Sequence, residues 1–214
     1  MKILAVLLKT FFIIALCRGS DFKYGGCPKV VVMNNLDFDR FSGIWYVIQR
    51  YSPKATCTKI IFEKAPDGTY TMNETGRLLG LNSNTFDTKT RKIEFLRNDS
   101  RSVFRAEKNI THFTLSTFGV IDTNYVMYAI VWGCDPFLFA SVQNIDIMSR
   151  IPIPSKDLVK NAERLLKDLS IDYSSMKNVD QSNCTELPST TTSSSKDTNN
   201  IVIASNPPER TEKQ

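Results

Sequence analysis

The chain has 214 residues, of which 42% are hydrophobic, with 27 Lys plus Arg, 22 Asp plus Glu, five Cys and a single His, His112. This length fits one folded domain with a terminal extension. The net charge of +5 falls to +2 without Lys2, Lys9 and Arg18, and no run of basic residues remains, so the charge does not support binding to nucleic acid. A single His excludes zinc sites that need several imidazoles, and we expect no metal site and no catalytic residue.

Residues 1–19 have the features of a secretory signal peptide. Lys2 precedes an apolar stretch that is too short to span a bilayer, and Cys17 and Gly19 are small residues in the positions expected before a cleavage site. Cleavage after Gly19 predicts a secreted, extracellular protein with no transmembrane segment, and it removes Cys17. A buried N-terminal helix and a lipid-modified Cys17 are the alternatives.

The remaining cysteines and the sequons also fit an exported glycoprotein. Four cysteines remain after cleavage: Cys27, Cys57, Cys134 and Cys184. An even number in an exported chain predicts two disulfides, for which three pairings are open. Four N-glycosylation sequons begin at Asn73, Asn98, Asn109 and Asn183.

Most of residues 20–185 show the period-two alternation of apolar and polar residues that is typical of strands. The expected strands cover residues 43–51, 57–64, 69–74, 91–97, 102–107, 113–121, 126–133 and 137–148. Their connections are too short for crossover helices, which predicts an antiparallel sheet closed as a sandwich or a barrel. The assignment within residues 77–121 stays open, because this region has more short apolar runs than we can assign to strands.

One amphipathic helix is predicted near residues 155–169, and a tail follows it. Ser155 is a suitable N-cap, and apolar residues recur every three or four positions through Leu169. We expect this face to pack against the sheet, with a helix on a membrane surface as the alternative. Residues 186–214 are rich in Ser and Thr and are predicted to form a disordered tail.

The segment 35–48 resembles the opening motif of the lipocalins, a short helical turn that leads to Gly-x-Trp, here Gly43 and Trp45. Two further family motifs have counterparts at Thr123, Asn124, Tyr125 and at Arg150. The resemblance implies an all-β, eight-stranded antiparallel up-and-down barrel with one C-terminal α-helix packed outside. It also implies that Arg150 stacks on Trp45 as a structural pair. Because the family usually has Asp where this chain has Asn124, we expect a neutral hydrogen bond there.

The cysteine positions narrow the resemblance to the branch that includes apolipoprotein D and the insect bilin-binding lipocalins. That branch implies the disulfides Cys27–Cys134 and Cys57–Cys184. An eight-stranded barrel is either filled by side chains or holds one small ligand. Alternation and the family register predict these cavity-lining residues: Thr58, Ile60, Phe62, Tyr70, Met72, Met127, Ala129 and Val131. On the last strand, two registers are open, with either Asn144 and Asp146 or, after one bulge, Ile145 and Ile147 facing inward.

The predicted function is a secreted carrier that binds a small hydrophobic ligand in the barrel cavity, such as a fatty acid or other lipid, a sterol, a retinoid or a bilin. The alternatives are a biliverdin-binding pigment carrier and a protein-interaction lipocalin that acts through its rim and tail. We do not expect an enzyme, because a lipocalin isomerase needs a free thiol and all four mature cysteines are expected to be paired. No cofactor is expected apart from a bound lipid or bilin. The further candidate partners are a cell-surface receptor and a lipoprotein particle.

Overall fold

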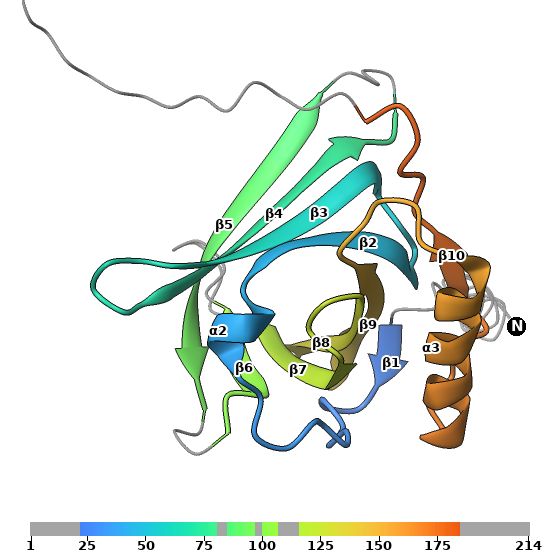
Figure 1. Ribbon diagram of the computed structural model, residues 1–214. Coiled ribbons are helices and arrows are strands. Elements are labelled where there is room, and N and C mark those ends of the chain that lie inside the picture. Colours follow the sequence, from blue (N-terminus) through green and yellow to red (C-terminus); the bar gives the residue numbers. More distant parts are fainter. Residues whose placement is uncertain (1–21, 81–84, 97–99, 107–115, 185–214) are drawn as a thin grey trace, which may run out of the picture. The chain divides into compact units, whose positions relative to one another are not determined.

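A computed structural model describes residues 22–80, 85–96, 100–106 and 116–184 of the chain. The predicted signal peptide (1–19), the predicted tail (186–214) and the sequons at Asn98 and Asn109 lie outside the described residues. The elements follow in the order β1 (Phe22–Tyr24), α2 (Phe38–Phe41), β2 (Gly43–Tyr51), β3 (Ala55–Lys64), β4 (Tyr70–Leu78), β5 (Phe86–Phe95), β6 (Val103–Ala106), β7 (Ser116–Thr123), β8 (Tyr128–Phe137), β9 (Ala140–Ser149), α3 (Lys156–Asp168) and β10 (Met176–Asn178) (Figure 1).

Strands β2 to β9 form a closed barrel. Each strand pairs antiparallel with the next along the chain, and β9 also pairs with β2, which closes the sheet. This arrangement confirms the predicted eight-stranded up-and-down barrel. In the region where the assignment was open, β5 begins at Phe86 rather than at residue 91, and β6 covers only Val103–Ala106. The two short terminal strands extend the wall, β1 on the edge of β9 and β10 on the edge of β2.

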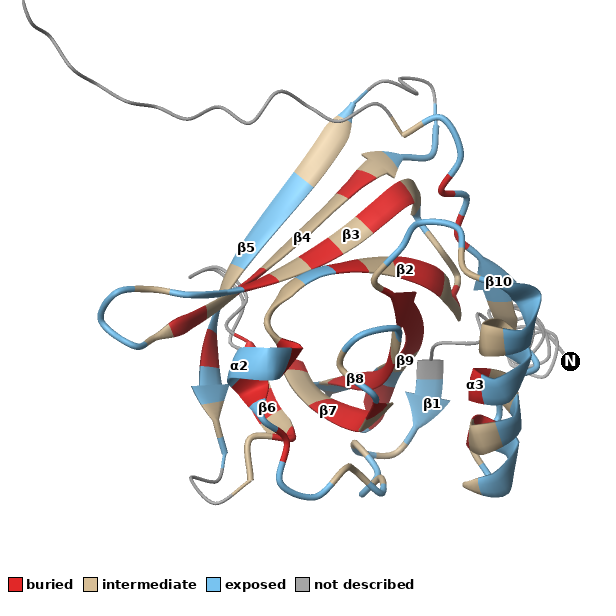
Figure 2. Cartoon of the chain, in the orientation of Figure 1, coloured by how far each residue is buried: buried red, intermediate tan, exposed pale blue. Residues whose placement is uncertain are grey.

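One end of the barrel is closed by α2. The carboxylate of Asp37 caps this helix and accepts a hydrogen bond from the amide of Arg40 at 3.1 Å. Phe38 and Phe41 are 1% and 0% exposed and turn into the barrel, where both rings meet Phe62 at centroid distances of 5.7 and 5.0 Å. Figure 2 shows buried and less buried positions alternating along the strands, as expected for a wall with one face towards a core.

Helix α3 packs on the outside of the barrel, as predicted (Figure 1). The hydroxyl of Ser155 accepts a hydrogen bond from the amide of Leu158 at 3.3 Å and caps the helix. Ala162 and Leu166 are buried in one cluster with Ile147 of β9. The apolar face of α3 therefore covers the barrel wall instead of a membrane surface. Among the described residues, no helix is both long and apolar enough to cross a membrane.

After α3 the chain returns to the barrel wall between β2 and β3. The direct β2–β3 ladder ends early, and β10 takes over the free edge of β2. The amide of Val179 donates to the carbonyl of Ile48 at 2.9 Å. Gln181 is 8% exposed, and its Nε2 donates to the carbonyls of Val47 in β2 and Thr58 in β3, each at 2.8 Å. This segment therefore bridges two barrel strands where their own pairing has ended.

Two disulfides join the terminal segments to the barrel. Their pairings are Cys27–Cys134 and Cys57–Cys184, the pairings that the resemblance implied. They close loops with sequence separations of 107 and 127 residues. In the chain-entropy model, such loops contribute up to ~4 to 5 kcal/mol each to the free energy of unfolding. The first disulfide ties the N-terminal coil to β8, and the second ties the C-terminal segment to β3.

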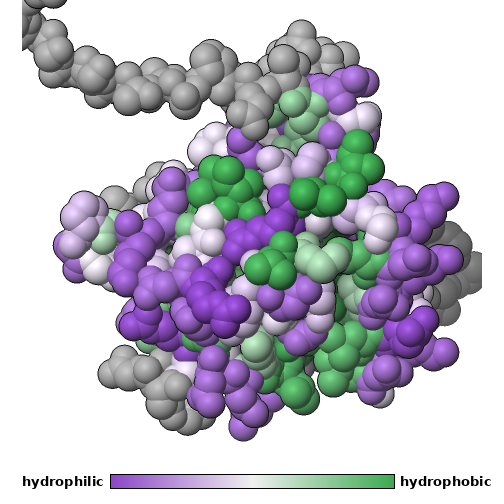
Figure 3. Space-filling view, viewed as in Figure 1, coloured by the Kyte–Doolittle hydropathy of each residue, from purple (hydrophilic) through white to green (hydrophobic). Residues whose placement is uncertain are grey.

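Exposed apolar side chains occur at both ends of the barrel. Those near the closed end are between 53% and 72% exposed: Val126, Met127, Ile151 and Ile153. Those at the open end are between 59% and 87% exposed: Tyr24, Leu79, Leu138 and Phe139. In the face drawn in Figure 3, apolar side chains form separate groups with hydrophilic side chains between them. Single exposed apolar residues are normal on protein surfaces. Their position and local conformation therefore decide which of them indicate a binding surface.

Candidate functional site

The barrel interior is packed towards α2 and hollow towards the open end. Six of the residues predicted to line a cavity belong to one hydrophobic cluster: Ile60, Phe62, Tyr70, Met72, Ala129 and Val131. Of these, Ile60 and Met72 also line the hollow part, together with Thr58. Alternation along the strands thus places these seven residues inside the barrel, but only three of them reach the cavity.

The prediction that Met127 lines the cavity is wrong. Its side chain is 53% exposed, and the residue lies in the turn between β7 and β8. Its amide donates to Oδ1 of Asn124 at 2.8 Å, a contact within that turn. Strand β8 begins at Tyr128, so the alternation that turns Ala129 inward does not extend to Met127.

The hollow part is a cavity of about 260 Å³ that opens at the end opposite α2. Its apolar wall includes Ile60, Met72, Phe118 and Val142. Its polar wall includes Arg50, Glu74, Arg91, Asn144 and Asp146. The volume is close to the lower limit of ligand pockets, which is about 300 Å³. The cavity therefore suits one small ligand with both apolar and polar parts.

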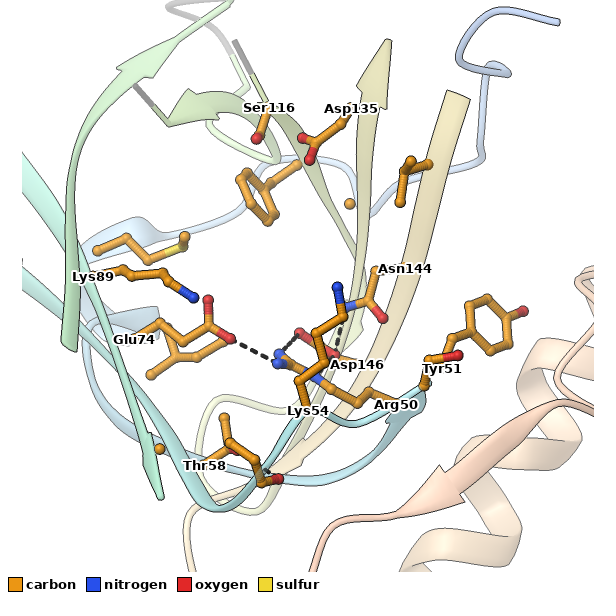
Figure 4. A pocket seen from close by; sticks show the side chains of 18 of the residues that line it. Arg50, Tyr51, Lys54, Thr58, Glu74, Lys89, Ser116, Asp135, Asn144 and Asp146 are labelled. Carbon is orange, nitrogen blue, oxygen red and sulfur yellow. Dashed lines mark hydrogen bonds and ion pairs between the residues drawn. The ribbon is translucent and has the colours of Figure 1, made fainter. Parts of the chain in front are cut away.

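Four charged side chains form a network across the barrel where the cavity meets the packed core. Arg50 donates from Nε and Nη2 to the two carboxylate oxygens of Asp146 at 2.9 and 2.7 Å, and from Nη1 to Oε1 of Glu74 at 2.6 Å (Figure 4). Arg91 contacts the other oxygen of Glu74 at 3.4 Å. We call Arg50, Glu74, Arg91 and Asp146 the charged quartet. Its side chains are between 6% and 20% exposed, so solvent screens these ion pairs only weakly.

The environment keeps Arg50 and Glu74 ionised. Burial disfavours the charge on Arg50, but Asp146 and then Glu74 outweigh this effect, and the pKa of Arg50 is raised above its ordinary value. Burial alone would raise the pKa of Glu74. The positive charges of Arg50 and then Arg91 more than offset burial, so the pKa of Glu74 lies below its ordinary value. With two guanidinium groups and two carboxylates, the quartet has no net charge.

Arg91 is the member of the quartet with the most unused hydrogen-bond donors. Arg50 uses three of its five N–H groups on carboxylate oxygens, whereas Arg91 makes one long contact with Glu74 among the described residues. Nearer the mouth, Lys89 pairs with Asp87 at 3.1 Å and keeps 59% of its side chain exposed. Both cations line the cavity, which can therefore offer hydrogen-bond donors to acceptor oxygens of a ligand.

The structure resolves the register of β9. Asn144 and Asp146 face the cavity, where Nδ2 of Asn144 donates to Oδ1 of Asp146 at 2.7 Å. Ile145 and Ile147 face outward into the cluster beneath α3. The β8–β9 ladder runs without a register shift from end to end, so the register with an unbroken count is the one observed.

Sequence reasoning missed Arg50 and Arg91 as cavity residues and gave Glu74 no role. Alternation along β4 does place Glu74 on the inward face with Met72, as observed. Arg50 could not be found in this way, because a β-bulge after Val47 shifts β2 by one residue. Without the bulge, strict alternation from Val47 would turn Gln49 inward instead.

At the closed end, Trp45 and Arg150 form the stacked pair that the resemblance implied. The guanidinium carbon of Arg150 lies 3.7 Å from the ring centroid of Trp45. The same guanidinium donates to the carbonyls of five residues: Arg40, Phe41, Ser42, Ile44 and Tyr125. Gly43 has φ +98°, and a Cβ there would lie 3.2 Å from Nη1 of Arg150. This position therefore favours glycine for both its backbone conformation and its close approach.

The turn Thr123–Asn124–Tyr125 supports the same end of the barrel. The hydroxyl of Thr123 donates to the carbonyl of Tyr128 at 2.6 Å and accepts from the amide of Tyr125 at 2.9 Å. Oδ1 of Asn124 accepts hydrogen bonds from the amides of Met127 and Tyr128 at 2.8 and 3.1 Å. Asn124 thus makes neutral hydrogen bonds within its own turn.

The chain is similar to proteins of one family in both sequence and structure. Guinea pig (Cavia porcellus) apolipoprotein D is 27% identical over 182 residues, which cover 82% of this chain and 93% of that protein. Rat (Rattus norvegicus) apolipoprotein D is 25% identical over 177 residues, 79% of this chain and 90% of the relative. Both alignments cover most of the chain. In its sequence and in its closed barrel, the chain resembles the lipocalins.

Solved structures agree with the lipocalin fold. Insecticyanin from the tobacco hornworm Manduca sexta superposes with a TM-score of 0.62 at 19% identity, over 76% of this chain and 89% of that one. Lobster apocrustacyanin A1 superposes with a TM-score of 0.56 at 15% identity, over 75% of this chain and 91% of that one. No family model matches the chain.

Two of the predicted glycosylation sites lie among the described residues. Asn73 is on β4 between the inward residues Met72 and Glu74, and its Nδ2 donates to Oε2 of Glu63 at 2.7 Å. Asn183 is exposed next to the second disulfide. Glycosylation at either asparagine remains a prediction.

Proposed function

We propose that this protein is a secreted carrier that binds one small amphipathic ligand at the open end of its barrel. The observation that carries the proposal is a cavity of about 260 Å³ with an apolar wall beside a buried charged quartet. Transfer of apolar surface from water into such a cavity contributes about 25 cal/mol per Å². The lipocalin barrel shared with apolipoprotein D and insecticyanin supports a carrier of a small hydrophobic ligand.

The quartet favours a ligand whose polar group carries acceptor oxygens, such as a carboxylate. A wholly apolar ligand would cover the unused donors of Arg91 without supplying an acceptor, at a cost of about 1–3 kcal/mol. A carboxylate would form charge-assisted hydrogen bonds with these donors. The acceptor group is therefore assigned to Arg91 rather than to Arg50, which Asp146 and Glu74 already hold.

The other candidate functions have less support from this geometry. A bilin has four pyrrole rings and is larger than a cavity of about 260 Å³, so the pigment-carrier alternative requires the mouth to widen. Among the described residues, all four cysteines form disulfides, which leaves no thiolate there for an isomerase mechanism. The receptor-binding alternative relies partly on residues 186–214, which lie outside the described residues.

Titration calorimetry with dodecanoic acid and dodecanol tests the proposal, because the two ligands have the same tail and different polar groups. The wild-type protein should bind the acid saturably and about tenfold more tightly than the alcohol. Arg91→Met should remove this preference, whereas Arg164→Met on the exposed face of α3 should keep it. Absence of saturable binding for both ligands would refute the carrier. Equal affinities for the two ligands in the wild type would refute only the role of Arg91.

A further inference from the structure

The hairpin that joins β8 to β9 exposes two large apolar side chains beside the cavity mouth. Its loop has only two residues, Leu138 and Phe139, which are 86% and 67% exposed. Tyr24 of β1, 87% exposed, lies against this tip with a ring-centroid distance of 6.0 Å to Phe139. The amide of Gly25 donates to the carbonyl of Phe139 at 2.9 Å. The tip is therefore an ordered apolar projection. We call Tyr24, Leu138 and Phe139 the apolar tip.

The residue types in this loop contradict its turn geometry. Leu138 has φ +48°, a left-handed value that two-residue hairpins normally give to Gly, Asn or Asp. A branched apolar side chain gains nothing in such a turn, and at 86% exposure it contacts little of the protein. A residue that breaks a local conformational preference and gains no packing contact in return is expected at a position where function requires it. The turn therefore indicates that something outside this chain contacts Leu138 and Phe139.

The apolar tip lies on the rim of the cavity. Val142 and Gln143, which follow the tip in β9, both line the cavity. The order of strands around the barrel places the β4–β5 connection opposite the β8–β9 hairpin. At the β4–β5 connection, Leu78 and Leu79 are 39% and 59% exposed, and Leu78 also lines the cavity. Two exposed apolar points therefore flank the mouth on opposite sides of one rim.

We propose that this rim docks on an anionic lipid surface. A lipid surface can receive both apolar points at once while it stays fluid in front of the mouth, whereas a rigid partner resting on both points would seal the mouth. Tyr and Phe rings suit the boundary between water and lipid. Two exposed lysines line the mouth and complement anionic headgroups: Lys54 and Lys89. Asp87 and Asp135 offset part of this charge, so apolar contact is the main contribution and charge a secondary one.

Co-sedimentation of the mature chain with phosphatidylcholine–phosphatidylglycerol vesicles tests this surface. The variant Leu138→Gly/Phe139→Ser removes both apolar side chains and places glycine at the left-handed position, so its thermal midpoint should not fall. The matched control is Val126→Ser/Met127→Ser, which changes the exposed apolar hairpin residues near the closed end. The wild type and the control should bind the vesicles, and the tip variant should bind about tenfold less.

Each outcome decides the proposal. Equal vesicle binding by the tip variant and the wild type would overturn it, as would a wild type that binds neither these vesicles nor pure phosphatidylcholine vesicles. If sedimentation velocity shows a dimer that only the tip variant loses, and the wild type does not bind vesicles, the tip contacts a second copy and the lipid proposal is wrong. Binding of dodecanoic acid should be unchanged in the tip variant. Failure of this proposal is thereby distinguishable from failure of the carrier function.

Discussion

Replacing Arg50 by Met should destabilise the barrel strongly, because this guanidinium neutralises two buried carboxylates. Its three charge-assisted hydrogen bonds, at 2.6–2.9 Å, would be lost together. Removing one partner of a buried ion pair costs about 3–5 kcal/mol, chiefly because the remaining charge stays buried without compensation. In the variant, Glu74 would still contact Arg91 at 3.4 Å. Asp146, whose side chain is 6% exposed, would keep only the hydrogen bond from the side-chain amide of Asn144 among the described residues. We therefore expect a loss of about 3–5 kcal/mol at about pH 7.

The loss should depend on pH with a definite sign. In the wild type the pKa of Glu74 is below its ordinary value, so its ion pairing stabilises the fold above the unfolded pKa, and this contribution is lost as the pH falls through the folded pKa. Without Arg50, burial of Glu74 is no longer outweighed, and its folded pKa should rise. Protonation of Glu74 then raises the free energy of unfolding of the variant and lowers that of the wild type. The difference in the free energy of unfolding should shrink between about pH 7 and about pH 4.

Urea unfolding with intact disulfides, followed by tryptophan fluorescence at both pH values, measures this difference. The double variant Arg50→Met/Asp146→Asn should recover at least about half of the loss, because Glu74 keeps Arg91 as its counter-charge and a neutral amide at position 146 needs none. Arg164→Met, which removes an exposed guanidinium from α3, should change the free energy of unfolding by no more than about 0.5 kcal/mol. A loss below about 1 kcal/mol for Arg50→Met, or an equal loss at both pH values, would refute the argument from buried charge.

Three further predictions concern the rest of the barrel. Arg150→Met should lower the free energy of unfolding in urea by about 3–5 kcal/mol, because five carbonyls lose their donor, and a loss below about 1 kcal/mol would contradict this. Burial and then Asp122 raise the pKa of Tyr128 to about 12. The contribution of its protonated hydroxyl to the free energy of unfolding is therefore fully present below the unfolded pKa of about 10 and is lost as the pH rises towards 12. Tyr128→Phe should flatten that decline in alkaline unfolding curves. Gly119→Ala should cost about 1–3 kcal/mol in thermal unfolding, because its Cβ would lie 2.8 Å from Cγ1 of Val32, and an unchanged midpoint would show that this contact relaxes.

The barrel wall could be predicted because it depends on local periodicity. Ile60 and Met72 face inward simply because their strands alternate, and the closed-end pair of Trp45 and Arg150 belongs to motifs that lie at strand ends. Helix α3 was predictable for a similar reason, since one apolar stripe and one cap, Ser155, define it. Features of this kind can be predicted because a few residues that are close together in the sequence determine each of them.

The cavity floor could not be predicted because it depends on irregularities and on distant partners. One bulge in β2 turns Arg50 inward, and a single extra residue of this kind leaves no reliable trace in an apolar–polar pattern. The partners of Arg50 are 24 residues away at Glu74 and 96 residues away at Asp146, so only the closed barrel brings them together. The prediction that Met127 lines the cavity was wrong for the opposite reason, because the alternation of β8 was extended beyond the strand into the turn that precedes it.

The division of the barrel into a packed half and a hollow half determines how it can recognise a ligand. The aromatic core beneath the quartet, with Phe62 and Phe104 1% and 0% exposed, leaves no apolar space into which a ligand tail could extend past the charges. A bound tail must therefore run from the quartet towards the mouth, along Ile60, Met72 and Val142. Because the quartet rests on close-packed side chains, its donors are held in place before a ligand arrives, and little ordering is required on binding. The polar group should therefore determine which ligand is accepted, while the tail mainly contributes affinity in proportion to the apolar surface that it buries.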